Sequence, residues 1–170
     1  MATTLLKTKH FRVERFKFTR KGRSIEFHRI VISKTTIVIP LLDDGRIIME
    51  RQYRPVIGKH MYELPAGHVE KGEAPTSAAE RELEEEIGYK AGALELMFSA
   101  YVAPGSSTER MFYYVATKLK KTHTRLEPDE FIEHEAMRFE KALSMVKDGR
   151  IIDTKTITAL LYYKSFFSGK

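Results

Sequence analysis

The segment from residue 75 to residue 87 most constrains what this chain can fold into. Pro75 suits the first position of a helix, Ser77 and Glu80 have the spacing of a capping box, and Gly88 is a typical left-handed stop. The pattern predicts a helix over about 75–87, with two candidate starts that lie two residues apart. Ala79, Leu83 and Ile87 recur at helical spacing, so one stripe of this helix can face a sheet.

The same helix carries five glutamates although the whole chain has a net charge of +6. Like charges four residues apart on a helix repel each other by roughly 0.2–0.5 kcal/mol per pair. Helical spacing brings Glu82, Glu85 and Glu86 together beside the apolar stripe, whereas Glu80 and Glu84 point elsewhere. Converging carboxylates either raise each other's pKa or hold a hard cation such as Mg²⁺. A solvated charged face is the alternative interpretation of the glutamates alone.

The order of predicted elements indicates an α/β (α+β) fold, in which a mixed β-sheet is sandwiched between helices. A hairpin near the amino terminus predicts an additional antiparallel sheet. Predicted strands cover residues 11–18, 24–32, 35–42, 46–54, 61–67, 93–102, 109–119 and 134–139, and further helices cover 140–149 and 153–167. Since there is no repeat or linker, we expect one domain over 1–170.

Composition restricts the classes of function. Cysteine is absent, which excludes disulfides, thiolate metal sites and cysteine nucleophiles. We find no apolar run of transmembrane length and no secretory signal, so we expect a cytoplasmic protein with no membrane partner. No dense lysine and arginine block accompanies the basic charge, so we expect a scattered basic surface and no nucleic acid partner. A small phosphorylated ligand is a further interpretation of the basic charge.

A longer motif contains these glutamates. Gly67 is followed after five residues by Glu73, and after seven more by the run Arg81-Glu82-Leu83-Glu84-Glu85-Glu86-Ile87-Gly88. This pattern resembles the Nudix hydrolase signature at every fixed position, and only Tyr89 departs from the usual small aliphatic residue. The resemblance implies a loop–helix–loop that binds Mg²⁺, with Mn²⁺ as a substitute, and hydrolyses a nucleoside diphosphate linked to another group.

The resemblance also assigns roles to residues of the motif. It implies that Glu82 and Glu86 are the main metal ligands, that Glu85 assists them, and that the backbone carbonyl of Ala66 completes the metal shell. Arg81 is expected to orient the glutamates. A glutamate from a later acidic loop should act as a further ligand or as general base. Glu130 matches that position, and Glu127 and Asp129 are the alternatives.

The flanking sequence narrows the resemblance to the ADP-ribose pyrophosphatase and nucleoside diphosphate sugar hydrolase branch. RQYR at 51–54 precedes YELPAG at 62–67, and Pro104 lies 16 positions beyond Gly88. This branch implies cleavage of ADP-ribose to AMP and ribose 5-phosphate. The candidate substrate-binding residues are Arg51, Arg54, Glu63, Pro104, Gly105, Ser106 and Phe27.

Relatives in this branch are dimers that exchange their amino-terminal strands, so the resemblance implies a homodimer in which residues 1–40 cross to the partner. Phe27 is then a candidate to stack on adenine from the partner chain. Two alternatives remain open. The substrate could be another nucleotide sugar such as GDP-mannose, or the protein could be a sensor that binds ADP-ribose without cleaving it.

Overall fold

The interior of the protein is organised around strand β4 (Thr35–Pro40), all six residues of which are buried. A computed structural model describes residues 2–126 and 131–168. Side chains alternate along a strand, so Ile37 and Ile39 enter one hydrophobic core while Val38 enters a second core on the opposite face. A strand covered on both faces explains why this segment reads as a continuous apolar, β-branched run.

Two sheets form the body of the molecule. In the four-stranded sheet, β4 pairs in parallel with β10 and the other neighbours are antiparallel. The order in this sheet is β7 (Ala66–His68), β4, β10 (Arg110–Thr117) and β9 (Ala93–Tyr101). The second sheet is antiparallel, with the order β12 (Ile132–Arg138), β5 (Arg46–Arg54) and β6 (Lys59–Glu63). A short pair joins β8 (Tyr89–Lys90) to β11 (Lys120–Lys121).

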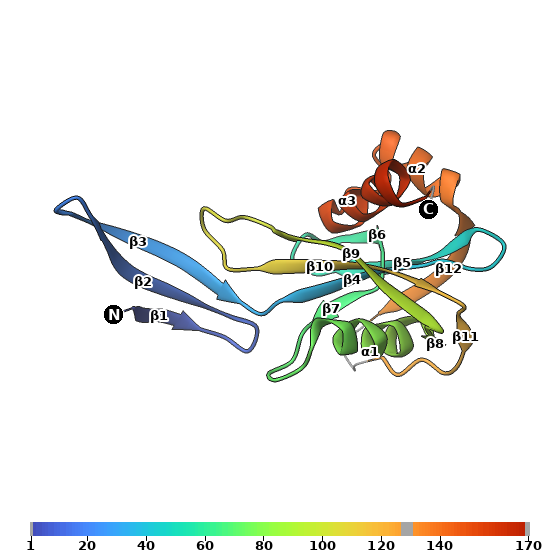
Figure 1. Ribbon diagram of the computed structural model, residues 1–170, viewed down its shortest axis with the longest axis horizontal. Helices are drawn as coiled ribbons and strands as arrows, with labels where there is room; N and C mark the ends of the chain where they lie inside the picture. Colours follow the sequence, from blue (N-terminus) through green and yellow to red (C-terminus); the bar gives the residue numbers. More distant parts are fainter. Residues whose placement is uncertain (1, 127–130, 169–170) are drawn as a thin grey trace.

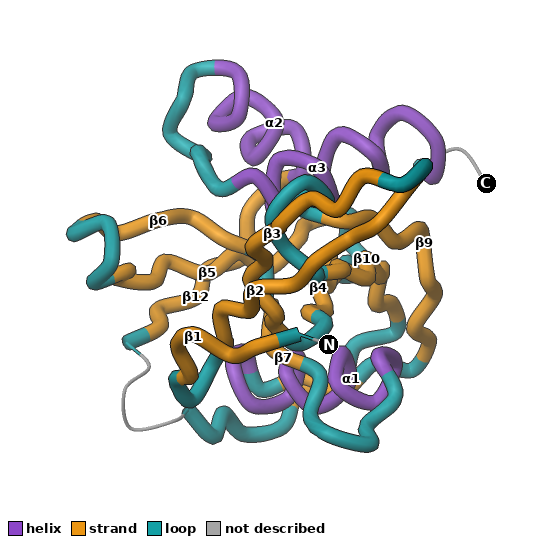
Figure 2. The backbone as a smooth tube through the Cα atoms, turned by 90° about the vertical axis from the view of Figure 1, so that its left-hand side faces the viewer, coloured by secondary structure: helices purple, strands orange, loops and turns teal. Residues whose placement is uncertain are grey.

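Helices cover the two sides of this body, as both views show (Figures 1 and 2). On one side lies α1 (Pro75–Ile87), whose stripe of Ala79, Leu83 and Ile87 packs in one core cluster with Val38. On the other side lie α2 (Phe139–Lys147) and α3 (Thr154–Tyr162), which continues into a π-helical turn (Tyr163–Phe167). The predicted mixed sheet between helices is confirmed.

An N-terminal arm, residues 3–32, projects from this body (Figure 1). It is an antiparallel sheet of β1 (Thr3–Lys7), β2 (Phe11–Arg20) and β3 (Arg23–Ile32), which confirms the predicted antiparallel sheet and adds β1 to it. Residues 1–32 contain nine lysines and arginines against two glutamates, a formal charge of +7, whereas the whole chain carries +6. The arm therefore holds all of the net positive charge.

The arm also carries large apolar side chains that the described part of the chain leaves uncovered. The exposed residues on it are Leu5, Leu6, Phe11, Phe18, Ile25, Phe27 and Ile30. Phe16 and Phe27 stack with ring centroids 5.7 Å apart, and Phe18 contacts Phe27 edge-on at 6.3 Å. These uncovered apolar side chains make the arm a candidate surface for contact with another chain.

Two local predictions are corrected by the structure. Helix α1 begins at Pro75 with Ala74 as N-cap, and no side chain of the described residues caps it, so Ser77 and Glu80 do not form a capping box. The predicted strand 61–67 is divided at Leu64 and Pro65 into β6 and β7, which belong to different sheets. Gly88 does end α1 in the left-handed conformation, at φ 70°. Within the described ranges, no helix has the length and apolar character needed to span a membrane.

Candidate active site

Arg81 lies at the centre of the carboxylate cluster on α1. Its Nη1 donates to Glu82 Oε1 at 2.8 Å and to Glu85 Oε2 at 3.0 Å. Its Nε donates to Glu73 Oε1 at 3.1 Å, and its Nη2 donates to the His68 carbonyl at 3.0 Å. Although burial opposes the charged form, the bond to Glu73 and the charge of Glu82 raise the pKa of Arg81 above its ordinary value. The guanidinium of Arg81 therefore contacts three of the motif glutamates, Glu73, Glu82 and Glu85.

Gly67 is required by the position of Glu82. A Cβ placed at Gly67 would lie 2.0 Å from both Cδ and Oε1 of Glu82, so the carboxylate occupies the space that any larger residue would fill. Strand β7, which contains Gly67, pairs with β4 and also contacts α1. The spacing between this glycine and the helix thus brings one carboxylate directly onto the backbone of β7.

Glu86 reaches the same region from the next turn of α1 and is only 4% exposed. The backbone N–H of Ala66 donates to its Oε2 at 2.9 Å. Ala66 was predicted to offer its carbonyl to a metal ion, and the structure shows its amide group holding one of the predicted ligands. Glu82 is also buried, at 8% exposed, whereas Glu85 is half-buried.

A second charge cluster lies between β5, β6 and the start of α3. Glu63 accepts two hydrogen bonds from Arg54, at 2.8 Å to Oε1 and 2.7 Å to Oε2. Lys155 also donates to Glu63 Oε2 and lies 3.0 Å from Asp153. Burial would raise the pKa of Glu63, but the bonds from Arg54 and the charge of Lys155 outweigh it and hold this pKa below its usual value.

Sequence reasoning missed three residues of these clusters. Lys155 and Asp153 lie at the start of α3, where a helical pattern gives no sign that a lysine is 12% exposed and pairs with β6. Glu50 directly follows the apolar run of β5 and is only 2% exposed. Burial and the nearby charge of Glu63 raise its pKa. An acidic residue immediately after three apolar strand residues was the available signal for Glu50.

Arg51 and Arg54 do not converge as a pair. Arg54 is the partner of buried Glu63, but Arg51 is exposed and forms an ion pair with Glu133 at 3.5 Å. Side chains alternate between the two faces of a strand, so residues three apart point to opposite faces. The two arginines therefore lie on different faces of β5. Both arginines are candidate substrate-binding residues by sequence, and only Arg54 joins the charge clusters.

The predicted Pro104–Ser106 loop lies between β9 and β10 and packs against the base of the arm. The Ile30 N–H donates to the Ser106 carbonyl at 2.8 Å, and the Thr108 N–H donates back to the Ile30 carbonyl at 3.0 Å. The space beside Gly105 is open, because no described atom lies within 4 Å of the place that a Cβ would take. Phe27 lies further along the arm, where it stacks on Phe16. Glu130 and its alternatives Glu127 and Asp129 lie outside the described residues.

No three acidic or histidine side chains within 2–126 and 131–168 are already grouped closely enough to hold an ion. Two of the predicted ligands, Glu82 and Glu85, are instead bonded to the guanidinium of Arg81. The donor set nevertheless suits a hard cation, since it consists of carboxylate oxygens. In addition, Oε1 of Glu50 is buried and has no hydrogen-bond partner among the described residues.

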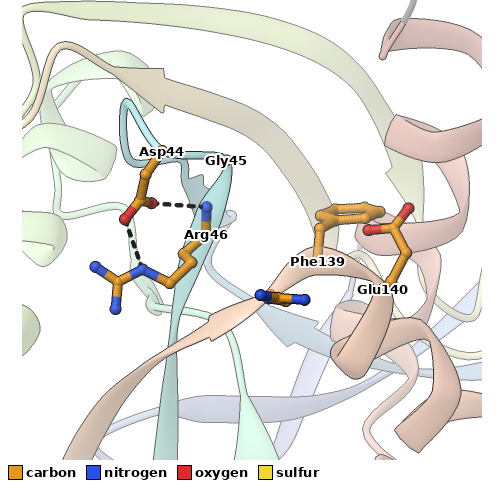
Figure 3. A pocket seen from close by; sticks show the side chains of 6 residues that line it. Asp44, Gly45, Arg46, Phe139 and Glu140 are labelled. Atoms are coloured by element: carbon orange, nitrogen blue, oxygen red, sulfur yellow. Dashed lines mark hydrogen bonds and ion pairs between the residues drawn. The ribbon is translucent and has the colours of Figure 1, made fainter.

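A cavity of about 640 Å³ lies apart from these clusters, between the β4–β5 turn and the start of α2 (Figure 3). It is lined by Asp44, Gly45, Arg46, Arg138, Phe139 and Glu140. Its two carboxylates are already paired, Asp44 with Arg46 at 2.7 Å and Glu140 with Lys164 at 3.0 Å. None of the motif residues lines it, so we do not assign the active site there.

The fold is a mixed sheet between helices, and one of these helices, α1, carries the cluster of carboxylates. Residues 32–160 match the NUDIX domain family. The chain therefore belongs to the Nudix family, and it is a Nudix pyrophosphohydrolase.

Similar proteins of the family align with most of the chain. The chain is 39% identical over 127 residues to a methanol dehydrogenase activator of Bacillus methanolicus, covering 74% of this chain and 69% of that protein. It is 38% identical, with the same coverage, to an ADP-ribose pyrophosphatase of Bacillus subtilis strain 168. A GDP-mannose pyrophosphatase of Yersinia pestis strain Pestoides F is 32% identical, in an alignment that covers 96% of this chain and 89% of that protein.

A solved structure of an ADP compounds hydrolase has the same fold. It superposes with a TM-score of 0.86 over 99% of this chain and 92% of that chain, at 20% identity. The match includes the arm as well as the body, since it covers almost the whole chain.

Replacing Gly67 with alanine tests the contact with Glu82. Because the clashing atoms are the flexible end of a side chain, we expect Glu82 to leave Arg81, at a cost of about 1 kcal/mol in the free energy of unfolding. Urea unfolding measures the cost, and a crystal structure of Gly67→Ala shows the displacement. Lys71→Ala, in the turn between β7 and α1, is the control. An unmoved Glu82 carboxylate in Gly67→Ala would contradict the packing described here.

Replacing Lys155 with methionine tests the second cluster. Glu63 has a depressed pKa, so its stabilising effect is present above its ordinary pKa and is lost as the pH falls through the folded value. Lys155→Met should therefore lower the free energy of unfolding at pH 7 by up to about 3 kcal/mol, and by less near pH 4. Lys164→Met, which breaks the exposed pair with Glu140, should cost under about 1 kcal/mol. A pH-independent cost for Lys155→Met would refute this account.

Proposed function

We propose that this protein hydrolyses the pyrophosphate bond of ADP-ribose, in the presence of Mg²⁺, to AMP and ribose 5-phosphate. The observation that carries the proposal is that Glu82 and Glu86 are buried at one side of α1, beside Gly67 and Arg81. Buried carboxylates of this kind are costly unless a cation compensates them. The 38% identical ADP-ribose pyrophosphatase supports this choice of substrate.

Each side chain then has a role. Glu82, Glu85, Glu86 and the Ala66 carbonyl would hold Mg²⁺, which would neutralise the diphosphate and lower the pKa of a bound water. Arg81 balances the charge of the glutamates in the metal-free protein, and its bonds to Glu73 and His68 keep it nearby when it releases them. A carboxylate takes the proton from water, with Glu85 and Glu130 as the candidates.

Arg54 is the candidate to bind the phosphates. Its side chain is about two-fifths exposed although its Nε and Nη2 both donate to Glu63. A guanidinium fixed in this way presents its remaining N–H groups in a defined direction, which suits pairing with a phosphate. Glu63 then acts by positioning Arg54, and Lys155 prevents the buried carboxylate from drawing Arg54 away from the substrate.

GDP-mannose is the second candidate substrate. The observation in its favour is coverage, because the Yersinia GDP-mannose pyrophosphatase aligns with 96% of this chain, including the arm, whereas the ADP-ribose pyrophosphatase aligns with 74%. Both substrates share a diphosphate between two sugars, so the same carboxylates would serve either. A sensor that binds without cleaving is disfavoured, since every motif carboxylate is present.

We also propose that residues 1–170 form one Nudix unit that works as a homodimer, with the arm crossing to the partner. The exposed apolar residues of the arm supply a surface that another copy can cover. Opposite charges favour the same arrangement. The arm carries +7, and the acidic cluster of α1 lies in the body. Arginines and lysines of one arm beside the acidic site of the partner would help attract an anionic substrate.

Hydrolysis by a panel of variants tests the function. The purified protein with Mg²⁺ should release AMP from ADP-ribose, and Glu86→Gln should reduce kcat/KM by at least roughly 100-fold, because it removes a metal ligand. Glu80→Gln, an exposed glutamate of the same helix, is the control and should match the unaltered protein. GDP-mannose and UDP-glucose are measured in parallel. A higher kcat/KM for GDP-mannose than for ADP-ribose would replace the first proposal with the second.

The oligomeric state tests the role of the arm. Sedimentation equilibrium should give the mass of a dimer, and the double variant Phe11→Glu, Ile30→Glu should give a monomer, because two buried charges would oppose the interface. Thr19→Glu, near the tip of the arm, is the control and should remain dimeric. A monomeric unaltered protein at micromolar concentration would rule out the exchange.

A further inference from the structure

Glu50 is a buried acid that the proposed roles leave without a purpose. It lies in β5 directly after Ile47, Ile48 and Met49, all of which are buried. The residue is 2% exposed, and its Oε1 has no hydrogen-bond partner among the described residues. A carboxyl oxygen that is buried without a partner is less stable than one in water, so an aliphatic residue would fit this strand more favourably.

The surroundings of Glu50 show what is missing. Its carboxyl group is hydrogen-bonded to Glu86 of α1, and its cross-strand neighbour is Glu63. The two nearby cations, Arg54 and Lys155, both donate to Glu63. Glu50 and Glu86 therefore meet in a buried place, where one oxygen of Glu50 is left unsatisfied by the described residues.

We propose that Glu50 is a further ligand of a divalent cation, which it shares with Glu86 on the inner side of the active site. This role rests on the metal-dependent function proposed above and adds a ligand from β5 that the Nudix motif does not contain. The unpartnered Oε1 supplies a free lone pair, and Glu86 supplies a second carboxylate. An oxygen-only pair selects a hard ion such as Mg²⁺ or Mn²⁺.

An ion at this place would connect two parts of the fold. Glu86 is held from one side by the amide of Ala66 at 2.9 Å, and Glu50 approaches it from the three-stranded sheet. An ion between them joins α1 to β5, which is the strand that also carries Arg54. Binding of the metal would then fix the helix that holds the glutamates relative to the strand that holds the candidate phosphate ligand.

Direct Mn²⁺ binding tests the proposal without depending on turnover. The full chain is stripped with chelator, and free Mn²⁺ is followed by electron paramagnetic resonance during titration of the unaltered protein, Glu50→Gln, Glu50→Leu, Glu86→Gln and Glu80→Gln. Glutamine keeps the shape of Glu50 and can still donate a hydrogen bond to Glu86, but it is a weaker metal ligand. We expect both Glu50 variants to bind Mn²⁺ more weakly, by roughly 10–100-fold. Glu80→Gln should bind as the unaltered protein does.

The outcomes separate this proposal from the function on which it rests. If Glu86→Gln weakens Mn²⁺ binding while both Glu50 variants bind normally, Glu50 is not a ligand and the proposal fails alone. If Glu86→Gln also binds normally, the metal site itself is misplaced and both proposals fail. Thermal unfolding of the metal-free proteins shows whether the variants fold. We expect Glu50→Leu to melt no lower than the unaltered protein, and failure of both Glu50 variants to fold would show a structural role and overturn the proposal.

Discussion

The active-site region depends on the compensation of buried negative charge. Arg81 connects Glu73, Glu82 and Glu85, and Arg54 with Lys155 compensates Glu63. Without such cations, carboxylates this deep would take up protons or destabilise the fold. The two clusters use different elements, since Arg81 is part of α1 whereas Lys155 comes from α3. In the proposed function stability and catalysis are linked, because the groups proposed to bind ligands are also groups whose charges must be balanced.

Glu63 and Glu50 differ in the partners that the protein gives their carboxyl groups. Glu63 is satisfied by protein cations, so it can hold Arg54 in place without any ligand. Glu50 is different, because its Oε1 is unsatisfied among the described residues and a metal ion is the partner that would complete it. Glu50 would thus gain its missing partner only when a metal ion binds, whereas Glu63 already has its partners in the protein. This arrangement suits a hydrolase whose metal arrives with the substrate phosphates.

The arm also has groups that a single chain leaves without partners. The arm is strongly basic, and its aromatic and aliphatic side chains stay exposed in a single chain. The body has the opposite charge at α1, where its glutamates form an acidic region. The dimer that we propose would satisfy both parts at once. The match of an ADP compounds hydrolase over 99% of this chain shows that the arm belongs to the shared fold.

The sequence by itself determined helix α1, its glutamates and most of the strands, because periodicity, Pro75 and Gly88 act within a few residues. The motif spacing was also sufficient to identify the family. Tertiary structure alone decided that Gly67 lies under Glu82, that Lys155 reaches Glu63 across 92 residues, and that Arg51 points away from Arg54. It also revealed that Glu50 is buried beside Glu86. Such contacts depend on how distant segments pack, and no local pattern of residues encodes the distance between two strands or the cation that a buried acid meets.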